Sequence, residues 1–463
     1  MGDDRARLVV ADAEGRFLDH PDLEMLVWDG ENFRTPLREE LIQLPLGSDL
    51  FVLPGRVAVA LDPEREELVE VREGPDGQPV FAVSAFVAPA YVRLYHPAYE
   101  RMAGAPDLSL YAYAPVGWMN GRLYTAAVRV DADKRQDPYR FDVADIERRV
   151  IARKLAMPGN QTVRHLEHCA LGYHCRAAQN YFLDRWEAPL PAASTCNASC
   201  LGCISEQPDD NVTAAHKRLQ IPARVDDLVD VAVGHLERVP NGVVSFGQGC
   251  EGEPLVQGPV LEGTVRKIRE RTAAGVINLN SNGSLPKVVA RLADAGLDAI
   301  RISLNSARSD YYERYYRPTG YTLTDVEQSA REMSDRGRYV SLNYFVFPGV
   351  SDSPAEIDAL SGLIERGGVD LIQLRNLNID PELYLRELGD GAVDGPIGVV
   401  PFIHTLRHRF PHLRFGYFNP AKTRHGRAGP LPGATLADLY PPPAPWRGAA
   451  GAAPHQGSGV STR

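Results

Sequence analysis

The feature that most constrains the fold is a regular alternation of short apolar strands and amphipathic helical segments over residues 189–416. The pattern predicts strands at 190–194, 243–247, 276–281, 299–305, 339–347 and 370–376. Helical spacing separates each strand from the next, which gives six strand-helix units. Such alternation predicts an α/β fold with parallel strands joined by right-handed crossovers.

The strands of this region are apolar on one face and polar on the other. One two-residue register carries Ile277, Leu279, Ile300, Ile302, Leu304, Val340, Leu342, Ile372 and Leu374. The other carries Asn278, Asn280, Asn282, Arg301, Ser303, Asn305, Ser341, Asn343, Gln373 and Arg375. The apolar set is expected to face the covering helices, so the polar set points inward. A closed eight-stranded barrel fills its interior with branched apolar side chains. We therefore predict a partial (β/α)6 TIM-like barrel, whose inner polar groups either bond one another or hold a polar ligand.

The chain outside this region divides by pattern. Residues 1–140 predict a β-rich N-terminal domain, with turn signals at Asp29-Gly30, Asp76-Gly77 and Asn120-Gly121 between runs of β-branched and aromatic residues. Residues 141–188 predict a helical connector, and the partial barrel follows at 189–416. Residues 417–440 form a C-terminal extension, and residues 441–463, rich in Pro, Ala and Gly, are expected to be disordered.

Charge and hydropathy narrow the partners. The 50 basic and 60 acidic side chains give a net charge of −10, which argues against binding to nucleic acid or anionic lipid through bulk electrostatics. The longest uncharged apolar run, residues 80–92, is too short to span a bilayer and contains Pro89. The N-terminus has no basic-then-apolar signal region, so we expect a cytoplasmic protein. We expect no membrane partner, and the acidic charge disfavours RNA as a partner of the N-terminal domain without excluding it.

Three cysteines follow the first predicted strand at C-x3-C-x2-C spacing: Cys196, Cys200 and Cys203. Three thiolates on one loop can ligate three irons of a 4Fe–4S cluster and leave the fourth iron open. Zinc is the alternative metal, because it also accepts three cysteines and a fourth ligand. Structural zinc sites usually pair two separated C-x2-C knuckles, and the sequence has no second knuckle.

With these residues in view, the sequence resembles the radical S-adenosylmethionine (SAM) superfamily over about residues 189–380. The matching motifs, in order, are the cysteine loop, Glu251-Gly252-Glu253-Pro254, Asn280-Ser281-Asn282-Gly283, Ser303-Leu304-Asn305 and Phe347-Pro348-Gly349-Val350. Two positions depart from the family pattern. Glu251 stands where the family usually has glycine, and Gly202 stands where it usually has an aromatic residue.

The resemblance implies that Cys196, Cys200 and Cys203 hold the cluster and that SAM chelates the open iron. It further implies that SAM contacts involve Gly252, Glu253, Asn282, Arg301, Ser303, Asn305, Phe347 and Gly349. Backbone groups at Gly252 and Glu253 would meet the SAM amino group, and Arg301 its carboxylate. Ser303 and Asn305 would contact the ribose, and the backbone around Phe347 and Gly349 would flank adenine.

The activity implied by the resemblance is reductive cleavage of SAM to a 5′-deoxyadenosyl radical, which abstracts hydrogen from a substrate. The substrate is not identified and is expected to be a small molecule or a peptide, with an electron donor such as flavodoxin or ferredoxin. A second hypothesis is a non-catalytic iron–sulfur or zinc protein that uses the β-rich domain for binding. That hypothesis requires a fourth protein ligand on the cluster and no inward Ser303 and Asn305 pair.

The remaining cysteines leave alternatives open. Cys250 directly precedes the Glu251-Gly252-Glu253-Pro254 motif, so its thiol is a candidate hydrogen-atom donor to a product radical, the alternative being a packing role. His165 and Cys169 are four residues apart and share a face if their segment is helical. With Cys175, they predict either a second metal site or a surface helix with reduced cysteines.

Overall fold

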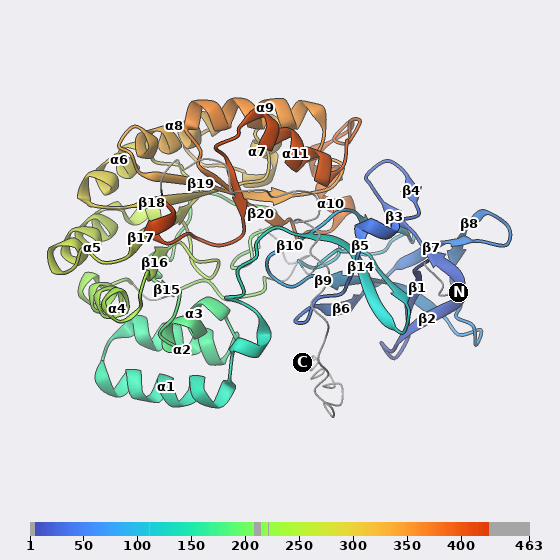
Figure 1. The fold of residues 1–463 in the computed structure, drawn as a ribbon, viewed down its shortest axis with the longest axis horizontal. Helices are drawn as coiled ribbons and strands as arrows, with labels where there is room; N and C mark the ends of the chain where they lie inside the picture. Colours follow the sequence, from blue (N-terminus) through green and yellow to red (C-terminus); the bar gives the residue numbers. More distant parts are fainter. Residues whose placement is uncertain (1–4, 111, 208–213, 221, 426–463) are drawn as a thin grey trace.

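The computed structural model describes residues 5–110, 112–207, 214–220 and 222–425 (Figure 1). It has a β-rich half, built from the N-terminal segment, and a half in which helices surround a parallel sheet. Three connector helices lie below that sheet in the view of Figure 1. The helices found in the described residues do not include one long and apolar enough to cross a membrane.

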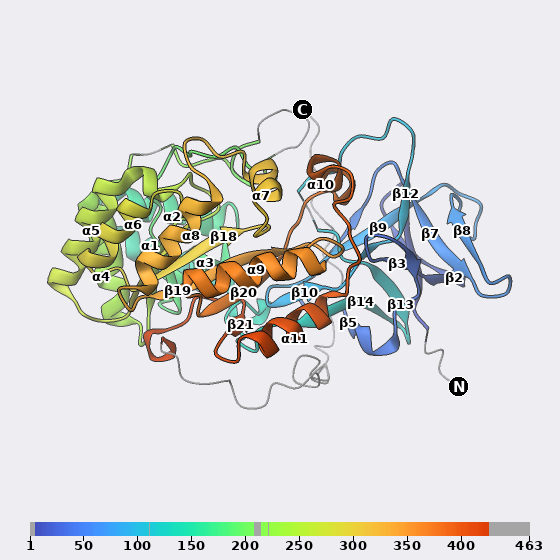
Figure 2. The same ribbon diagram turned by 90° about the horizontal axis from the view of Figure 1, so that it is seen from above.

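The parallel sheet has seven strands in sequential order. They are β15 (Glu187–Pro189), β16 (Val243–Phe246), β17 (Val276–Ser281), β18 (Ala299–Leu304), β19 (Tyr339–Val346), β20 (Leu371–Asn376) and β21 (Arg414–Gly416). The helices that follow them are α4 (Val225–Arg238), α5 (Gly258–Arg271), α6 (Pro286–Ala295), α7 (Ser309–Tyr316), α8 (Leu323–Ser334), α9 (Pro354–Gly367), α10 (Pro381–Leu388) and α11 (Val399–Arg409). Helices α4, α5, α6, α8 and α9 lie along the outside of the sheet in Figures 1 and 2. The predicted α/β architecture with a parallel sheet is confirmed.

The first and last strands differ from the sequence prediction. The first strand is Glu187–Pro189 rather than 190–194. Leu190 still donates its N–H to Ser245, but the next free amides, those of Ala192 and Ala193, donate to the Glu251 carboxylate instead of to a strand. At the other end β21 adds a seventh strand that the sequence pattern did not predict.

The two faces of the sheet separate as their alternation predicted. The predicted apolar set of β17–β20, from Ile277 to Leu374, belongs to the main hydrophobic core. On the inner face, Asn278 donates to Ser245 at 3.1 Å and Gln373 donates to Asn419 at 2.9 Å. Asn419 follows β21 and also donates to Glu187 of β15, at 2.9 Å. This bond connects the segment after the last strand to the first strand of the sheet.

The connector consists of α1 (Val143–Ala156), α2 (Gln161–Leu171) and α3 (Arg176–Phe182). Asn160 caps α2 by accepting the Val163 N–H at 3.0 Å, and its amide donates to Asp227 of α4. Val163, Leu166 and Cys169 of α2 are buried in the main core. The connector is therefore packed on the first strand-helix units and is not a loose linker.

The β-rich half contains an eleven-stranded sheet and a three-stranded sheet, all of their pairings antiparallel. Its strands are β1 (Arg7–Asp12), β2 (Phe17–Met25), β3 (Val27–Trp28), β4 (Phe33–Arg34), β5 (Leu41–Gln43), β6 (Asp49–Val52), β7 (Arg56–Asp62), β8 (Glu67–Val71), β9 (Val80–Phe86), β10 (Tyr91–Arg93), β11 (His96–Pro97), β12 (Tyr99–Arg101), β13 (Val116–Met119) and β14 (Arg122–Arg129). The Asn120-Gly121 turn joins β13 to β14, with φ of 51° and 74° at its two residues. Both angles are left-handed, which is what a type I′ hairpin requires and what Asn-Gly favours.

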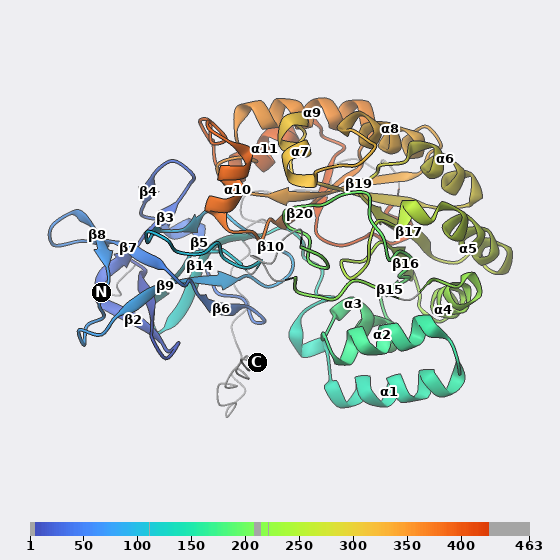
Figure 3. The ribbon, with the colours of Figure 1, turned by 180° about the vertical axis from the view of Figure 1, so that it is seen from behind.

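The β-rich half docks on the strands that end the parallel sheet, as the views of Figures 1 and 3 show for β10 and β20. The Arg93 N–H donates to Asn376 Oδ1 at 2.8 Å, and His96 Nε2 lies 2.9 Å from the Pro348 carbonyl oxygen. Arg56 of β7 and Asp380, the N-cap of α10, form an ion pair at 2.9 Å in which both side chains are fully buried. The two halves therefore share a polar, buried interface.

The division into domains at residues 140, 188 and 416 stays a prediction. Residues 417–425 of the predicted C-terminal extension are described, and they return to the sheet through Asn419. The rest of the extension and the whole predicted tail, 426–463, lie outside the described residues.

Candidate active site

A cavity of about 450 Å³ lies at the C-terminal ends of the parallel strands. All strands from β16 to β20, or the loops that directly follow them, contribute to its wall. The β-rich half contributes Phe86 and Val87. The cavity therefore lies where barrel-like α/β enzymes carry their sites, and it is partly closed by the N-terminal half.

All three motif cysteines line this cavity. Their loop is held against the end of α7, because the Ser199 and Leu201 N–H groups donate to the carbonyls of Tyr316 and Tyr315 at 3.1 and 3.0 Å. Gly202 lies against Tyr315, whose hydroxyl oxygen would be 2.5 Å from a Cβ placed on Gly202. The Tyr315 side chain also lines the cavity. An aromatic ring is thus present beside position 202, although it comes from another element.

The thiols of this loop suit a metal cluster. Burial raises the pKa of Cys196, and it raises that of Cys200 much further. Such thiols ionise when a cation binds them. Arg218 places a guanidinium nitrogen 3.5 Å from Cys203 Sγ, and Ser205 Oγ lies at the same distance. These two groups can donate to a cluster-bound sulfur.

The spacing of the sulfurs distinguishes a cluster from a single ion. Ligands of one tetrahedral zinc lie about 3.8 Å apart if both are thiolates. Within the described residues, the three motif sulfurs do not all lie within 4.8 Å of one another. A cluster places each thiolate on a different iron, so its three ligands do not have to converge on one ion.

The Gly252-Glu253 turn is fixed to the segment that follows β15. The N–H groups of Gly252 and Glu253 donate to the carbonyls of Ala193 and Thr195 at 2.8 and 2.9 Å. A Cβ on Gly252 would lie 2.0 Å from the Thr195 carbonyl oxygen, so only glycine fits. An ammonium group only donates hydrogen bonds, so the backbone of this turn can meet a SAM amino group through its carbonyl oxygens.

The two glutamates of this motif are buried and hold the turn together. The Glu253 carboxylate accepts the Ser281 hydroxyl at 2.6 Å and the Asn282 N–H at 2.8 Å. The Glu251 carboxylate accepts four backbone N–H groups, from Ala192, Ala193, Gly247 and Gln248, at 2.6–2.8 Å. Burial raises the pKa of each glutamate to about 7. Glu251, the departure from the family pattern, therefore ties the chain after β15 to the chain after β16.

Three further predicted residues, Asn282, Ser303 and Arg301, line the cavity. Asn282 donates to Asn197 of the cysteine loop at 2.9 Å, and Ser303 accepts from Asn343 at 3.3 Å. Arg301 donates to Gln373 at 3.2 Å, while its buried Nε has no hydrogen-bond partner among the described residues. Burial, with Arg375 nearby, lowers the pKa of Arg301 to about 9. An unsatisfied, buried guanidinium nitrogen at a cavity indicates a site for an anion.

Three predicted residues, Asn305, Phe347 and Gly349, are not part of the cavity lining. Asn305 is buried and donates to Tyr384 Oη at 3.0 Å. The Phe347 ring packs on His96, with ring centroids 4.4 Å apart. Gly349, with φ of 92°, approaches the Asp29-Gly30 turn so closely that a Cβ would lie 2.9 Å from the Asp29 carbonyl oxygen. The structure therefore uses this segment in the interface with the β-rich half.

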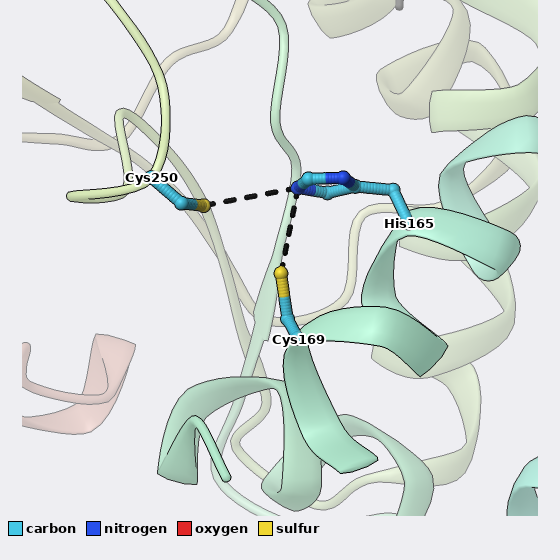
Figure 4. Close-up of side chains that lie close together, drawn as sticks. All are labelled: His165, Cys169 and Cys250. Carbon is cyan, nitrogen blue, oxygen red and sulfur yellow. Dashed lines mark hydrogen bonds between the residues drawn. The ribbon is translucent and has the colours of Figure 1, made fainter. Parts of the chain in front are cut away.

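Cys250 lies away from the motif cysteines, in a separate group with His165 and Cys169 of α2 (Figure 4). His165 Nε2 lies 3.4 Å from Cys169 Sγ and 3.8 Å from Cys250 Sγ. The segment is helical, so the predicted shared face of His165 and Cys169 is present. Cys175 lies outside this group of ligand atoms.

Several cavity residues were missed by the sequence reasoning. Arg375 and Asn343 belonged to the inward polar set, and that alternation was the signal that could have singled them out. Arg218 and Tyr315 carried no local signal, because they reach the cysteine loop from other parts of the chain.

Residues 190–360 match the Radical SAM superfamily. Curated proteins give no match. Among solved structures, the native anSMEcpe with bound AdoMet is similar at 17% identity and a TM-score of 0.32, over 42% of this chain and 52% of that one. The chain thus spans about half the length of that protein.

Two other similar structures are a radical SAM methyltransferase from Sphaerobacter thermophilus and SuiB from Streptococcus suis bound to S-adenosylmethionine. The methyltransferase shares 19% identity over 51% of this chain and 67% of that chain, with a TM-score of 0.37. SuiB shares 14% identity over 60% of this chain and 61% of that chain, with a TM-score of 0.35.

The family match confirms the predicted resemblance for residues 190–360. The cysteine loop, the Gly252-Glu253 turn and the inward polar strands all fall within the matched residues. Residues 190–360 are a radical SAM domain, of the kind that holds a 4Fe–4S cluster and S-adenosylmethionine.

Proposed function

We propose that this protein is a radical SAM enzyme whose partial TIM barrel holds both cofactors in the cavity at its strand ends. The observation that carries the proposal is the lining of that single cavity by Cys196, Cys200 and Cys203 together with Gly252 and Glu253. When bound, the cluster and SAM supply reductive cleavage of SAM to a 5′-deoxyadenosyl radical, which takes hydrogen from the substrate.

The residues of the chain bind and orient these groups. Cys196, Cys200 and Cys203 ligate the cluster, with Arg218 and Ser205 donating toward Cys203. Gly252 and Glu253 offer backbone carbonyls to the SAM amino group. Ser303 and Asn282 are placed to contact SAM from the strand ends. The SAM contacts predicted for Asn305, Phe347 and Gly349 remain predictions, and the first two are fully buried.

Two half-buried arginines favour anions in the cavity. Arg301 and Arg375 both line it, and each has a buried Nε without a hydrogen-bond partner among the described residues. We assign Arg301 to the SAM carboxylate. Arg375, which donates to the Tyr417 carbonyl at 2.7 Å, is assigned to a negatively charged group of the substrate.

The substrate is proposed to be a small molecule or a peptide that enters beside Phe86 and Val87 of the β-rich half. A flavodoxin or ferredoxin is the proposed electron donor. All six cysteines are free thiols, which suits the reducing cytoplasm.

The test is anaerobic reconstitution with iron and sulfide, followed by an assay for 5′-deoxyadenosine with dithionite and SAM. Wild-type protein is expected to bind about four irons and to release the nucleoside. The variant Cys196→Ala/Cys200→Ala/Cys203→Ala is expected to lose both. Cys175→Ala, a cysteine outside the cavity lining, is the matched control and should retain both.

Nucleoside release by the triple variant, or an iron content equal to that of wild type, would reject the assignment. A wild-type cluster that forms but neither binds nor cleaves SAM would favour the non-catalytic iron–sulfur protein. About eight irons per chain, falling to about four in the triple variant, would indicate a second cubane elsewhere.

A further inference from the structure

We propose that His165, Cys169 and Cys250 bind one zinc ion, at a site separate from the radical SAM cofactors. The three residues come from two distant parts of the chain, since His165 and Cys250 are 85 positions apart. Figure 4 shows the tip of the His165 imidazole facing both sulfur atoms, one from Cys250 and one from Cys169. The fold, and not the local sequence, assembles this donor set.

The distances fit a single small cation. Around a tetrahedral zinc, a sulfur and a nitrogen ligand lie about 3.6 Å apart and two sulfurs about 3.8 Å. In the structure the imidazole nitrogen lies 3.4 and 3.8 Å from the two sulfurs, and all three ligand atoms lie within 4.8 Å of one another. One ion can therefore reach all three with only small movements of the side chains.

The donor types select the ion. Two thiolates and one imidazole are soft and borderline donors, which favour zinc over magnesium or calcium. The compact spacing disfavours an iron–sulfur cluster, whose thiolates sit on separate irons. Three protein ligands leave the fourth position of a tetrahedral zinc to water, an arrangement known from open zinc sites.

The site is braced from both sides. Cys169 is buried in the core, and its helix α2 is capped by Asn160 and tied to α4. Cys250 accepts the Leu219 N–H on its carbonyl at 2.9 Å, which fixes its loop. His165 and Cys250 are half-buried, so an ion can enter from solvent. Donors held in place before binding lose little freedom when the ion arrives.

The proposed zinc site lies between helix α2 and the loop that leads into the Gly252-Glu253 turn. Cys250 immediately precedes Glu251, whose carboxylate organises the SAM-binding turn. A zinc ion would therefore fasten the connector helix α2 to the start of that turn. It would act as a staple for the cofactor site and not as a part of it.

The test measures zinc in protein that lacks the cluster-binding cysteines, because those thiols could also take up zinc. In full-length Cys196→Ser/Cys200→Ser/Cys203→Ser protein purified with zinc in the medium, we expect about one zinc per chain. Adding His165→Ala should reduce the zinc content at least fivefold. Adding His168→Ala, an exposed histidine on the same helix, should leave it unchanged. Cys250→Ser provides a second test if the His165 variant fails to fold.

Cobalt replacement reports the ligands directly. The triple-serine protein loaded with Co²⁺ should show thiolate-to-cobalt charge-transfer absorption and the visible bands of a tetrahedral site, and both should disappear with Cys250→Ser. Zinc content that does not depend on His165 and Cys250 would overturn the proposal. So would isolation of the protein with Cys169 and Cys250 joined in a disulfide and no zinc bound. Neither readout uses SAM cleavage, so this proposal can fail while the proposed enzyme function stands.

Discussion

The two groups of cysteines in this protein differ in their separation along the sequence and in their arrangement in space. Cys196, Cys200 and Cys203 lie within eight residues of sequence and line an open cavity, and within the described residues they do not form a compact group of ligand atoms. Cys169 and Cys250 are 81 positions apart in sequence, yet their sulfurs converge with one imidazole within 4.8 Å. Cysteines that are neighbours in sequence and line a cavity suit a cluster with an open iron. Ligand atoms that converge from distant parts of the chain suit a single ion.

The largest expected effect is the selective loss of one metal when a single cysteine of either group is replaced. Cys200→Ala should remove the cluster iron and lower 5′-deoxyadenosine formation by at least about 1,000-fold, because the cluster loses one of its three ligands. Its zinc content at the compact group should not change. Cys250→Ser should give the reverse result, with zinc lost and about four irons retained. Metal analysis of both proteins checks this, and loss of both metals in either protein would contradict two independent sites.

The next effect tests the turn that lies between the two groups. Gly252→Ala places a Cβ 2.0 Å from the Thr195 carbonyl oxygen, so the turn must move. A shift of about 1 Å at a reacting centre can cost about 100-fold, and we expect that loss in kcat/KM for SAM cleavage. Gly249→Ala is the matched control, because its Cβ would meet only the flexible end of Ile204. Equal losses in the two variants would show that the turn tolerates displacement.

A third prediction concerns pH and the Glu251 carboxylate beside Cys250. Burial raises its pKa from 4.5 to about 7, so between these values the folded protein binds a proton that the unfolded chain has released. The contribution of Glu251 to the free energy of unfolding is therefore fully present below pH 4.5 and is lost as the pH rises to about 7. This contribution is on the order of 3 kcal/mol.

The variant Glu251→Gln isolates this contribution. Its amide has one acceptor oxygen in place of two, so it should melt at a lower temperature than wild type at pH 5. Because glutamine does not titrate, the difference in melting temperature should narrow between pH 5 and pH 8. Circular dichroism melting curves check this, with exposed Glu270→Gln as the control. A difference that widens with pH would contradict the sign.

The smallest effect is expected at Ser303 on the cavity wall. Ser303→Ala removes a hydroxyl that lines the cavity, and it should raise the KM for SAM by about fivefold through the loss of one hydrogen bond. Its zinc and iron contents should equal those of wild type. Ser341→Ala on the neighbouring strand removes a hydroxyl bonded to the Ile300 carbonyl and serves as the control. An unchanged KM in Ser303→Ala would remove this residue from the SAM site.

Local patterns predicted the parts of the molecule that depend on neighbours in sequence. The strand alternation gave the sheet and its inward polar face, and the spacing of Cys196, Cys200 and Cys203 gave the cluster loop. Two-residue periodicity also placed Asn305 inward, but β18 ends at Leu304 and the chain then turns. Asn305 consequently bonds Tyr384 instead of facing the cavity.

Contacts between distant segments could not be predicted. The Phe347–Gly349 turn is occupied by His96 and the Asp29-Gly30 turn of the β-rich half, and no local pattern encodes that docking. Cys250 likewise meets His165 only because α2 packs beside the loop after β16. The contacts of the Glu251 carboxylate could not be predicted either, because its four N–H donors come from the ends of two different strands.

The buried ion pair of Arg56 and Asp380 limits how freely the two halves of the protein could be exchanged during evolution. The two charges come from opposite halves of the molecule, and both side chains are fully buried. Exchanging the β-rich half for an unrelated module would leave Asp380 buried without Arg56. Loss of one partner of a buried ion pair lowers the stability of a protein by about 3–5 kcal/mol. The two halves are therefore expected to be inherited together, and to vary as one unit and not as interchangeable parts.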